Sequence, residues 1–355
     1  ESFGREYMGE VNGVQGYTPF LDSLAKKGLF FRNGIANGRR SIEGIPAVLS
    51  GIPALMNEPF VTSTFSNGDF PGLGKRLLAG GYQTSFFHGG NNGTMHFDSY
   101  TESSGILSYF GASEYPDAKD NDGVWGIYDG PMLQWMRTRL DETPSPFLAS
   151  FFSLSSHNPY LIPDAVKDRY PEGPLPILKT IAYTDDMLRE FFEQAEKSPW
   201  FQNTLFVITA DHTFMPYLPQ FDHEIGRYQV PILFYHPTMK WPDGIDQEQI
   251  VQQIDILPSV LDFLGVPWEK PNLLSRSVFV PGERTASVFV NGLSMLIAKD
   301  QFLVWPQDQQ AKLYSMRDPE RKTALEEPEA KRHLEQRLKA AQQYFSDSML
   351  GNSWQ

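Results

Sequence analysis

Cysteine is absent from this chain of 355 residues. The protein therefore has no disulfide, no thiolate-ligated zinc site and no thiol nucleophile. A chain without cysteine suits an oxidising compartment and the cytosol equally well, so the absence alone gives no location.

Positive charge is also scarce. The chain has 30 Lys and Arg residues against 43 Asp and Glu residues, for a formal net charge of −13. A protein that binds nucleic acid needs a face rich in Lys and Arg to meet the phosphate backbone. We therefore expect no nucleic-acid partner.

Long apolar runs are missing as well. No run reaches the roughly 18 residues that a membrane-spanning helix needs, and no signal peptide is visible. The first residues, ESFGREYMG, have neither an initiating Met nor a preceding strand. We expect a fragment of a longer protein, in which any leader or membrane anchor lies upstream of residue 1.

What the chain does have is enough apolar sequence for a large core, with 41% hydrophobic and 14% aromatic residues. Near-continuous apolar runs predict buried strands of a parallel sheet that is covered on both faces, at 28–37, 84–90, 146–157, 204–212 and 230–237. Apolar residues at helical spacing predict helices between them, at 18–28, 178–197 and 253–266. This alternation predicts an α/β fold with a mostly parallel central sheet and helices on both faces.

The pattern changes at about residue 285. Three short apolar segments with turns between them indicate an antiparallel meander, and a charged amphipathic helix follows from residue 326. We predict two domains: a catalytic α/β domain over 1–284 and a small C-terminal α+β subdomain over 285–355.

Polar residues follow the ends of three predicted strands, at 88–92, 155–157 and 211–213. In open parallel sheets the site lies beyond the carboxyl ends of the strands, so these segments are expected to meet at one crevice. Asp211 and His212 offer a carboxylate oxygen and an imidazole nitrogen, which suit Mn²⁺ or Zn²⁺. By itself, an adjacent Asp-His pair at a strand end is more often a loop residue and a cap than a pair of metal ligands.

Ser41 follows a Gly-Arg-Arg loop and opens a segment with a helical pattern. The start of a helix presents backbone N–H groups and favours anions, so Ser41 is a candidate nucleophile at an anion site. Arg39 and Arg40 are candidate phosphate-binding residues beside it. The structural alternative is a Ser41 N-cap supported by Glu43.

These features together resemble the alkaline phosphatase/sulfatase superfamily. The resemblance runs along the whole chain and includes YTPFLDSLAKKGLFFRNGIAN, VQQIDILPSVLDFLGV and KLYSMRDPER. Within the superfamily, the ESF start, the Ser41 segment, SLSSHNPY and TADH are similar to the lipoteichoic acid synthase type of phosphoglycerol transferase. The related phosphoethanolamine transferases share this pattern.

The resemblance implies one divalent metal ion, with Mn²⁺ favoured over Zn²⁺ or Mg²⁺. By position, its ligands would be Glu1, Ser41, Asp211 and His212. Ser41 would also be the nucleophile, at a position where the family often has Thr.

Further site residues are implied by position. His157 matches a family His that contacts the transferred phosphoryl group, and His223 lies about where phosphoethanolamine transferases carry another His. Either imidazole is a candidate for the proton transfers. Asn92 and His96 lie where the synthases bind substrate, although this chain lacks the Trp and Arg found there in those enzymes.

The implied reaction is transfer of phosphoglycerol from phosphatidylglycerol to a glycan or polyglycerol-phosphate hydroxyl, through a covalent intermediate on Ser41. The partners would be a phospholipid donor and a glycan-type acceptor. By resemblance the domain acts outside the inner membrane, tethered by upstream helices.

Several alternatives remain. Phosphoethanolamine transfer is the first, and it is disfavoured because lipid A-modifying enzymes usually carry disulfides. A sulfatase needs Cys or Ser in a Cys/Ser-x-Pro-x-Arg motif, and the run Ser41-Ile42-Glu43-Gly44-Ile45 lacks both the Pro and the Arg. A phosphodiesterase-type hydrolase with a second metal would draw on Asp222 and His223. The last alternative is a homologue that has lost its metal and its activity.

Overall fold

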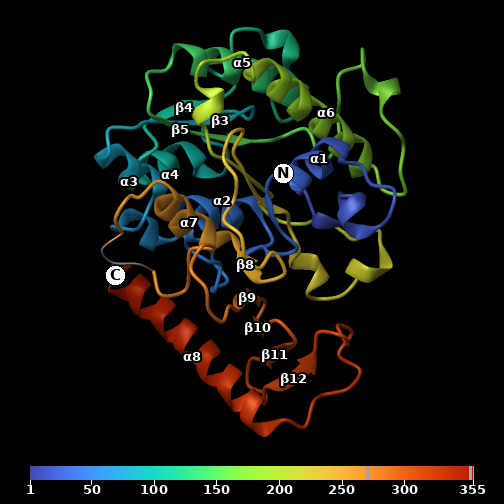
Figure 1. The fold of residues 1–355 in the computed structure, drawn as a ribbon, viewed down its shortest axis with the longest axis vertical. Coiled ribbons are helices and arrows are strands. Elements are labelled where there is room, and N and C mark those ends of the chain that lie inside the picture. The colour runs from blue at the N-terminus through green and yellow to red at the C-terminus, as the bar shows by residue number, and fades with distance from the viewer. Residues whose placement is uncertain (269–271, 352–353, 355) are drawn as a thin grey trace. The chain divides into compact units, whose positions relative to one another are not determined.

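The computed structural model describes residues 1–268, 272–351 and 354 (Figure 1). It divides into two compact units, each built from segments far apart in the sequence. Unit 1 comprises residues 1–30, 74–209 and 233–242. Unit 2 comprises residues 31–73, 210–232 and 243–355.

Unit 1 contains a parallel sheet with the strand order β4-β3-β5. Its strands are β3 (Gln83–His88), β4 (Ser108–Phe110) and β5 (Phe147–Phe152). A second sheet has the order β1-β7-β6 and uses β1 (Leu29–Phe31), β6 (Phe206–Thr209) and β7 (Ile232–Tyr235). Residues of β1, β3 and β7 are mostly buried, whereas those of β5 and β6 are mostly half-buried. The strands are rich in Phe, Leu and Ile, as is typical of a sheet that is covered on both faces.

The helices of unit 1 are α1 (Pro19–Lys27), α3 (Leu73–Ala79), α4 (Phe97–Ser103), α5 (Asp129–Glu142) and α6 (Ile177–Ala195). Helix α6 packs against both α1 and α5. A buried carboxylate connects α6 to α1, because Asp185 accepts hydrogen bonds from the backbone N–H groups of Phe20 (2.8 Å) and Leu21 (3.0 Å). These donors lie in the first turn of α1, where a helix has no internal acceptors to offer.

Unit 2 contains a parallel pair formed by β2 (Asn33–Ile35) and β8 (Ile250–Gln252). Helix α2 (Ser41–Ser50) packs against the 3₁₀ turn η11 (Gln253–Asp255) and against α7 (Ile256–Phe263). Gly51, with φ 66°, ends α2 in the left-handed region that favours glycine.

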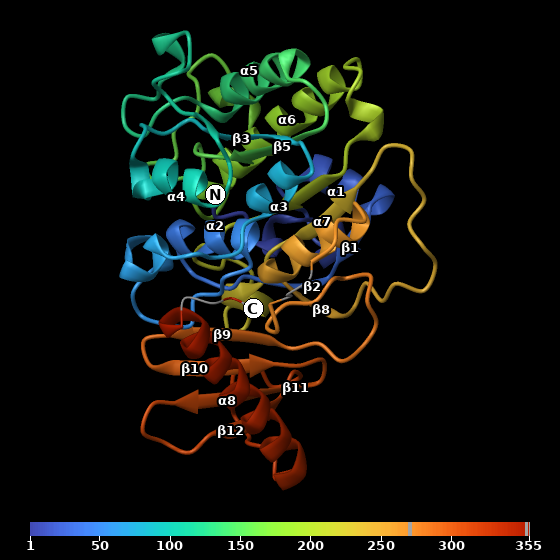
Figure 2. The same ribbon diagram turned by 90° about the vertical axis from the view of Figure 1, so that its left-hand side faces the viewer.

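The C-terminal part of unit 2 is an antiparallel sheet in the order β12-β11-β10-β9 together with α8 (Pro328–Leu350). The strands are β9 (Ala286–Val290), β10 (Leu293–Ile297), β11 (Gln301–Pro306) and β12 (Lys312–Ser315). Helix α8 lies across one face of this sheet (Figure 2), where Leu334 and Leu338 pack with Leu296, Leu303 and Leu313. The opposite face packs with Ile35 of β2 and Ile250 of β8.

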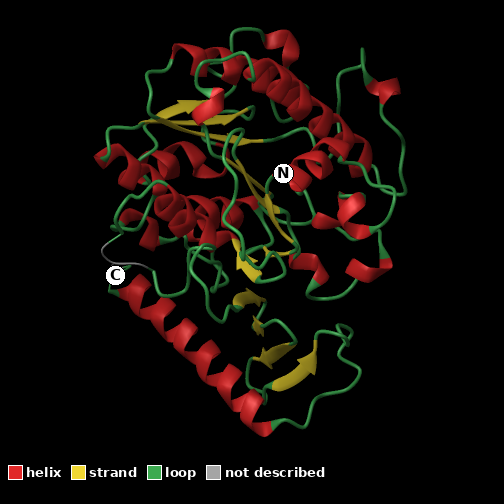
Figure 3. Ribbon diagram, in the orientation of Figure 1, coloured by secondary structure: helices red, strands yellow, loops and turns green. Residues whose placement is uncertain are grey.

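The predicted α/β fold with a small C-terminal antiparallel sheet and helix is confirmed, and Figure 3 shows the mixture of helices and strands. The predicted run at 28–37 divides into two strands, and the parallel pairing is distributed over short separate sheets. The domain boundary at 284/285 stays a prediction. Among the described residues, no helix combines the length and apolar character that crossing a bilayer requires.

Candidate metal and nucleophile site

Ser41 and the Asp211–His212 pair meet within unit 2. The Ser41 hydroxyl oxygen lies 3.4 Å from Nε2 of His212, and that nitrogen lies 3.2 Å from Oδ2 of Asp211. Ser41 and Asp211 are both 4% exposed, so the three side chains form a nearly enclosed cluster. Three polar groups from positions 170 residues apart therefore converge on one small region.

The orientation of His212 is set by its second ring nitrogen. Nδ1 lies 2.8 Å from the carbonyl oxygen of Thr213. A carbonyl only accepts, so Nδ1 carries the hydrogen and Nε2 keeps its lone pair in the neutral ring. Metal-ligating histidines commonly donate their other N–H in this manner, and the lone pair of His212 faces Ser41 and Asp211.

Ser41 is the first residue of α2, and the cap position before it belongs to Arg40. Ser41 is therefore not the N-cap of the structural alternative, and its hydroxyl lies inside the first turn of the helix. Glu43 still supports the helix start, because its Oε2 accepts from the backbone N–H of Arg39 at 2.8 Å. The hydroxyl thus lies where backbone N–H groups and the helix dipole favour an anion.

Gly44 allows α2 to approach the strand end that carries Asp211. A Cβ at residue 44 would lie 2.2 Å from the carbonyl oxygen of Asp211, which is closer than real atoms pack. A side chain at this position would force the start of α2 away from Asp211 and His212. Glycine is therefore required by the close approach of the two backbones.

The backbone at Asp211 is fixed by Gln253, a residue that the sequence analysis did not single out. The carboxamide nitrogen of Gln253 donates to the carbonyl oxygens of Ala210 (2.6 Å) and Asp211 (2.7 Å). Its Oε1 accepts from the backbone N–H of Asn37 at 2.7 Å. Gln253 is fully buried, so these hydrogen bonds connect the loop after β2 to the Ala210–Asp211 segment without competition from water.

The two arginines beside Ser41 lie at the surface. The Arg40 guanidinium pairs with Glu43, with Nε 2.9 Å from Oε1, and Arg39 lies over the ring of Tyr228 with 5.8 Å to the ring centroid. Both side chains are exposed, so an anion could reach them from solvent. Their role as a phosphate clamp stays a prediction.

Glu1 belongs to unit 1, where it is 8% exposed. Its backbone nitrogen donates to the Ser153 hydroxyl at 2.7 Å, and its carbonyl accepts from the Ser156 hydroxyl at 2.6 Å. Its Oε1 accepts from the hydroxyl of Ser2 at 2.5 Å. The residue is therefore held by the loop that follows β5.

The donor set suits a divalent cation. Asp211 and His212 belong to a carboxylate–imidazole group with the spacing at which such ligands share one metal ion. Carboxylate oxygen, imidazole nitrogen and hydroxyl oxygen are ligands of Mn²⁺, Zn²⁺ and Mg²⁺ and do not select among them. The residues present therefore fit a metal, and its identity stays open.

Comparison with known proteins adds the family. The Sulfatase family model matches residues 1–266. The chain belongs to the sulfatase family. Membership makes it an enzyme of the transferase and hydrolase kind within the alkaline phosphatase superfamily.

Two curated relatives and one solved structure are similar to this sulfatase-family chain. Lipoteichoic acid synthase-like YvgJ of Bacillus subtilis is 25% identical over 307 residues, which are 80% of this chain and 49% of the relative. Phosphoglycerol transferase I of Citrobacter koseri is 26% identical over 230 residues, which are 61% of this chain and 30% of the relative. The chain thus spans half or less of these relatives.

A crystal structure of an alkaline phosphatase superfamily protein from Vibrio parahaemolyticus is 25% identical, with a TM-score of 0.86. It covers 99% of this chain, and the match extends over 86% of that protein. The resemblance in the sequence to this superfamily and to phosphoglycerol transferases of the lipoteichoic acid synthase type is confirmed.

The two candidate proton-transfer residues of this sulfatase-family chain have different surroundings. His223 uses both ring nitrogens within its own turn, since Nε2 donates to the carbonyl of Gln220 (2.9 Å) and Nδ1 accepts from the N–H of Gly226 (3.0 Å). Burial lowers the pKa of His223. His157 follows β5 in unit 1, and only its Nδ1 has a hydrogen bond among the described residues.

The predicted substrate loop after β3 has an unusual backbone. Met95 and His96 both have positive φ, at 50° and 58°, which non-glycine residues rarely adopt. Such strain is often kept at functional sites. His96 is exposed, whereas Asn92 donates to both carboxylate oxygens of Glu114 at 3.0 and 3.1 Å. Substrate binding by these two residues stays a prediction.

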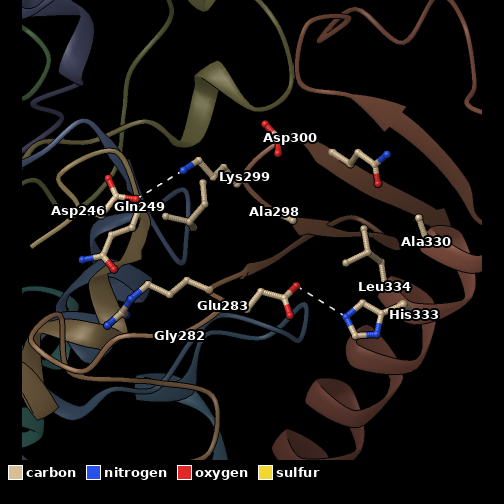
Figure 4. A pocket seen from close by; sticks show the side chains of 13 residues that line it. Asp246, Gln249, Gly282, Glu283, Ala298, Lys299, Asp300, Ala330, His333 and Leu334 are labelled. Atoms are coloured by element: carbon tan, nitrogen blue, oxygen red, sulfur yellow. Dashed lines mark ion pairs between the residues drawn. The ribbon is translucent and has the colours of Figure 1, made fainter.

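A polar cavity of about 590 Å³ lies in the C-terminal part of unit 2 (Figure 4). Its charges pair across it, with Lys299 3.5 Å from Asp246 and His333 3.7 Å from Glu283. Neither Ser41 nor the Asp211–His212 pair lines it. The cavity is therefore separate from the predicted site.

Proposed function

We propose that this chain is the catalytic part of a metal-dependent phosphoglycerol transferase. The donor is phosphatidylglycerol, and the acceptor is a hydroxyl of a glycan or of polyglycerol phosphate. The observation that carries the proposal is the position of the Ser41 hydroxyl in the first turn of α2, 3.4 Å from Nε2 of His212. The names of the curated relatives support the same headgroup.

The proposed metal ligands are Glu1, Ser41, Asp211 and His212, with Mn²⁺ as the favoured ion. The fit of Asp211, His212 and Ser41 to a divalent cation supports three of them, and the buried carboxylate of Glu1 is offered as the fourth. Such an ion, when bound, supplies charge neutralisation at the phosphoryl oxygens and favours the ionised form of the serine hydroxyl.

The reaction is proposed to proceed in two displacements. Ser41 Oγ forms a bond to the donor phosphorus while the bond from phosphorus to the diacylglycerol oxygen breaks, and diacylglycerol leaves with a proton. The acceptor hydroxyl then forms a bond to phosphorus, the Ser41 Oγ–phosphorus bond breaks, and the acceptor proton passes to Ser41 Oγ, which becomes a free hydroxyl again. Two such steps give net transfer with retention of the serine.

Groups of this chain are proposed to stabilise the charge on the phosphoryl oxygens and to transfer the protons. Backbone N–H groups at the start of α2 and the exposed guanidinium groups of Arg39 and Arg40 are proposed to stabilise negative charge on the phosphoryl oxygens. His157 is the better candidate for moving protons, because its Nε2 has no hydrogen bond among the described residues. General acid or base catalysis of this kind is typically worth about 10²–10⁴-fold.

Phosphatidylglycerol lies in a membrane, so the site is proposed to work at the outer face of the inner membrane. The tether would be a segment upstream of residue 1 in a longer protein. The relatives extend well beyond the matched region, which is consistent with such an addition.

A donor panel tests the proposal. Purified protein is offered labelled phosphatidylglycerol, labelled phosphatidylethanolamine and an aryl sulfate in detergent micelles, with wild type and Ser41→Ala side by side. We expect diacylglycerol release from phosphatidylglycerol only, and loss of that release in the variant. Turnover of phosphatidylethanolamine or of the sulfate in its place would assign the site to one of the alternative reactions.

A further inference from the structure

Trp125 is the residue in closest aromatic contact with His157. The two ring centroids are 4.0 Å apart with an interplanar angle of 56°. Trp125 is only partly exposed although its neighbour Val124 is 55% exposed, so the indole is turned toward the protein. The imidazole is therefore covered on one face by a large rigid side chain.

A single carbonyl group holds both rings. The indole N–H of Trp125 donates to the carbonyl oxygen of Asn158 at 2.5 Å, and Nδ1 of His157 lies 3.1 Å from the same oxygen. This oxygen only accepts, so Nδ1 of His157 carries the hydrogen in the neutral ring. Nε2 is then the nitrogen that is left to exchange a proton with a substrate.

The backbone of Trp125 is itself fixed. Oδ1 of Asp122 accepts from the backbone N–H groups of Val124 (2.8 Å), Trp125 (2.7 Å) and Gly126 (3.0 Å). Gly126, with φ 152°, pairs with Gly90 in the loop after β3. Trp125 thus projects from a turn that is tied to a strand end.

Asp129, four residues after Trp125, holds the segment that leads into His157. Its Oδ1 accepts from the backbone N–H of Leu154 at 2.6 Å, and its Oδ2 accepts from that of Ser155 at 3.1 Å. Thr184 of α6 donates to Oδ2 at 2.7 Å. The carboxylate is 1% exposed, so it forms a rigid buried support for the loop.

We infer that Trp125 is a positioning residue for the reaction: by holding the Asn158 carbonyl and packing against the imidazole, it fixes the orientation and the tautomer of His157 and leaves Nε2 to exchange a proton. Asp129 supports the loop that leads into His157 through its hydrogen bonds to Leu154 and Ser155. The inference rests on the proposed function, because it takes His157 to be a proton-transfer residue. It adds a residue that has no part in metal binding and that acts only through His157.

The test compares five proteins of the full chain in the phosphatidylglycerol assay: wild type, Trp125→Phe, Trp125→Ala, His157→Ala and the double variant Trp125→Ala/His157→Ala. Val124→Ala, an exposed neighbour, is the control and should match wild type. Thermal unfolding of each protein shows that a loss of activity is not a loss of folded protein.

We expect Trp125→Ala to lower kcat by about ten- to a hundredfold with little change in KM, the size of effect that misplacement of a catalytic group produces. Trp125→Phe keeps the ring and loses the N–H, so its loss should be smaller. Because Trp125 acts through His157, the double variant should be no slower than His157→Ala alone.

A spectroscopic readout accompanies the kinetics. In ¹⁵N NMR spectra, the imidazole signals assigned by their loss in His157→Ala should show a neutral ring with its hydrogen on Nδ1. Trp125→Ala should convert this state into a tautomer mixture. A merely structural role for Trp125 would leave these signals unchanged.

Three results separate the inference from the proposed function. If His157→Ala loses activity while Trp125→Ala keeps wild-type activity, the inference alone is overturned. The inference alone is also overturned if the loss of kcat in the double variant equals the product of the losses in the two single variants. A His157→Ala enzyme with wild-type activity overturns the catalytic role of His157 in the proposed function and the inference with it.

Discussion

The hydroxyl oxygen of Ser41 lies 3.4 Å from Nε2 of His212. This separation places a weak nucleophile beside a nitrogen lone pair and a buried carboxylate at a helix start. A serine in this setting is suited to ionisation and to attack on phosphorus.

Replacing Ser41 by Ala should reduce diacylglycerol release at least about 10³-fold, because the variant lacks the hydroxyl that is proposed as the nucleophile. Ser41→Thr should keep a measurable part of the activity, since it retains a hydroxyl on the same carbon. Both are measured as initial rates with phosphatidylglycerol. Equal loss in the two variants would contradict the role of the hydroxyl.

His212→Gln should lower the metal content of the purified protein well below one ion per chain, because Gln offers no imidazole nitrogen. Metal content is measured by mass spectrometry after dialysis against Mn²⁺. His333→Gln, an exposed histidine on α8, is the matched control and should bind as wild type does. Undiminished binding by His212→Gln would remove His212 from the ligand set.

Asp185 should make the folded state sensitive to pH. Burial raises the pKa of this carboxyl from its ordinary value of 3.8 to about 7, even though the N–H groups of Phe20 and Leu21 favour the charged form. The folded state therefore binds the proton more tightly than the unfolded chain does. The free energy of unfolding should fall as pH rises from about 4 to 7. Each unit by which the pKa differs between the folded and the unfolded state corresponds to about 1.4 kcal/mol.

Urea denaturation at several pH values between 4.5 and 7.5 measures this effect. Asp185→Asn should flatten the fall because the residue no longer titrates, whereas Asp164→Asn, at an exposed site, should leave it unchanged. An identical pH dependence in wild type and Asp185→Asn would show that other groups produce it.

Leu338→Ala should destabilise the C-terminal sheet and helix. Leu338 is 1% exposed and packs with Leu296 and Leu334, so truncation leaves a cavity, with a cost of about 2–5 kcal/mol in such cores. Guanidinium denaturation measures the change. Arg332→Ala, on the exposed side of α8, should have little effect; a loss as large as that of Leu338→Ala would argue against the packing role.

Much of the fold is predictable from the sequence because buried parallel strands are apolar along their whole length. β5, β6 and β7 fall inside predicted runs, and β3 begins one residue before the run predicted at 84–90. β4 (Ser108–Phe110) and β8 (Ile250–Gln252) have three residues each, which is too short to establish any periodicity. Their position depends on neighbouring strands, which is information that local sequence does not contain.

The site residues also divide into those that the sequence predicts and those that it does not. Ser41, Asp211 and His212 are recognisable because each stands at the end or start of a predicted element, and the structure brings them together. Gln253 and Trp125 gave no signal, because Gln253 acts on backbone groups 42 and 43 residues away and Trp125 on one 33 residues away. Residues that act through distant main-chain atoms carry no local motif.

Gly44 limits how this enzyme could be redesigned. Because glycine has no side chain, the backbone of Asp211 can occupy the space beside residue 44. A library that randomises residues 42–45 to seek a new headgroup should recover variety at Ile42 and only glycine at 44. Any larger residue there would move the Ser41 hydroxyl away from Asp211 and His212 before a substrate arrived.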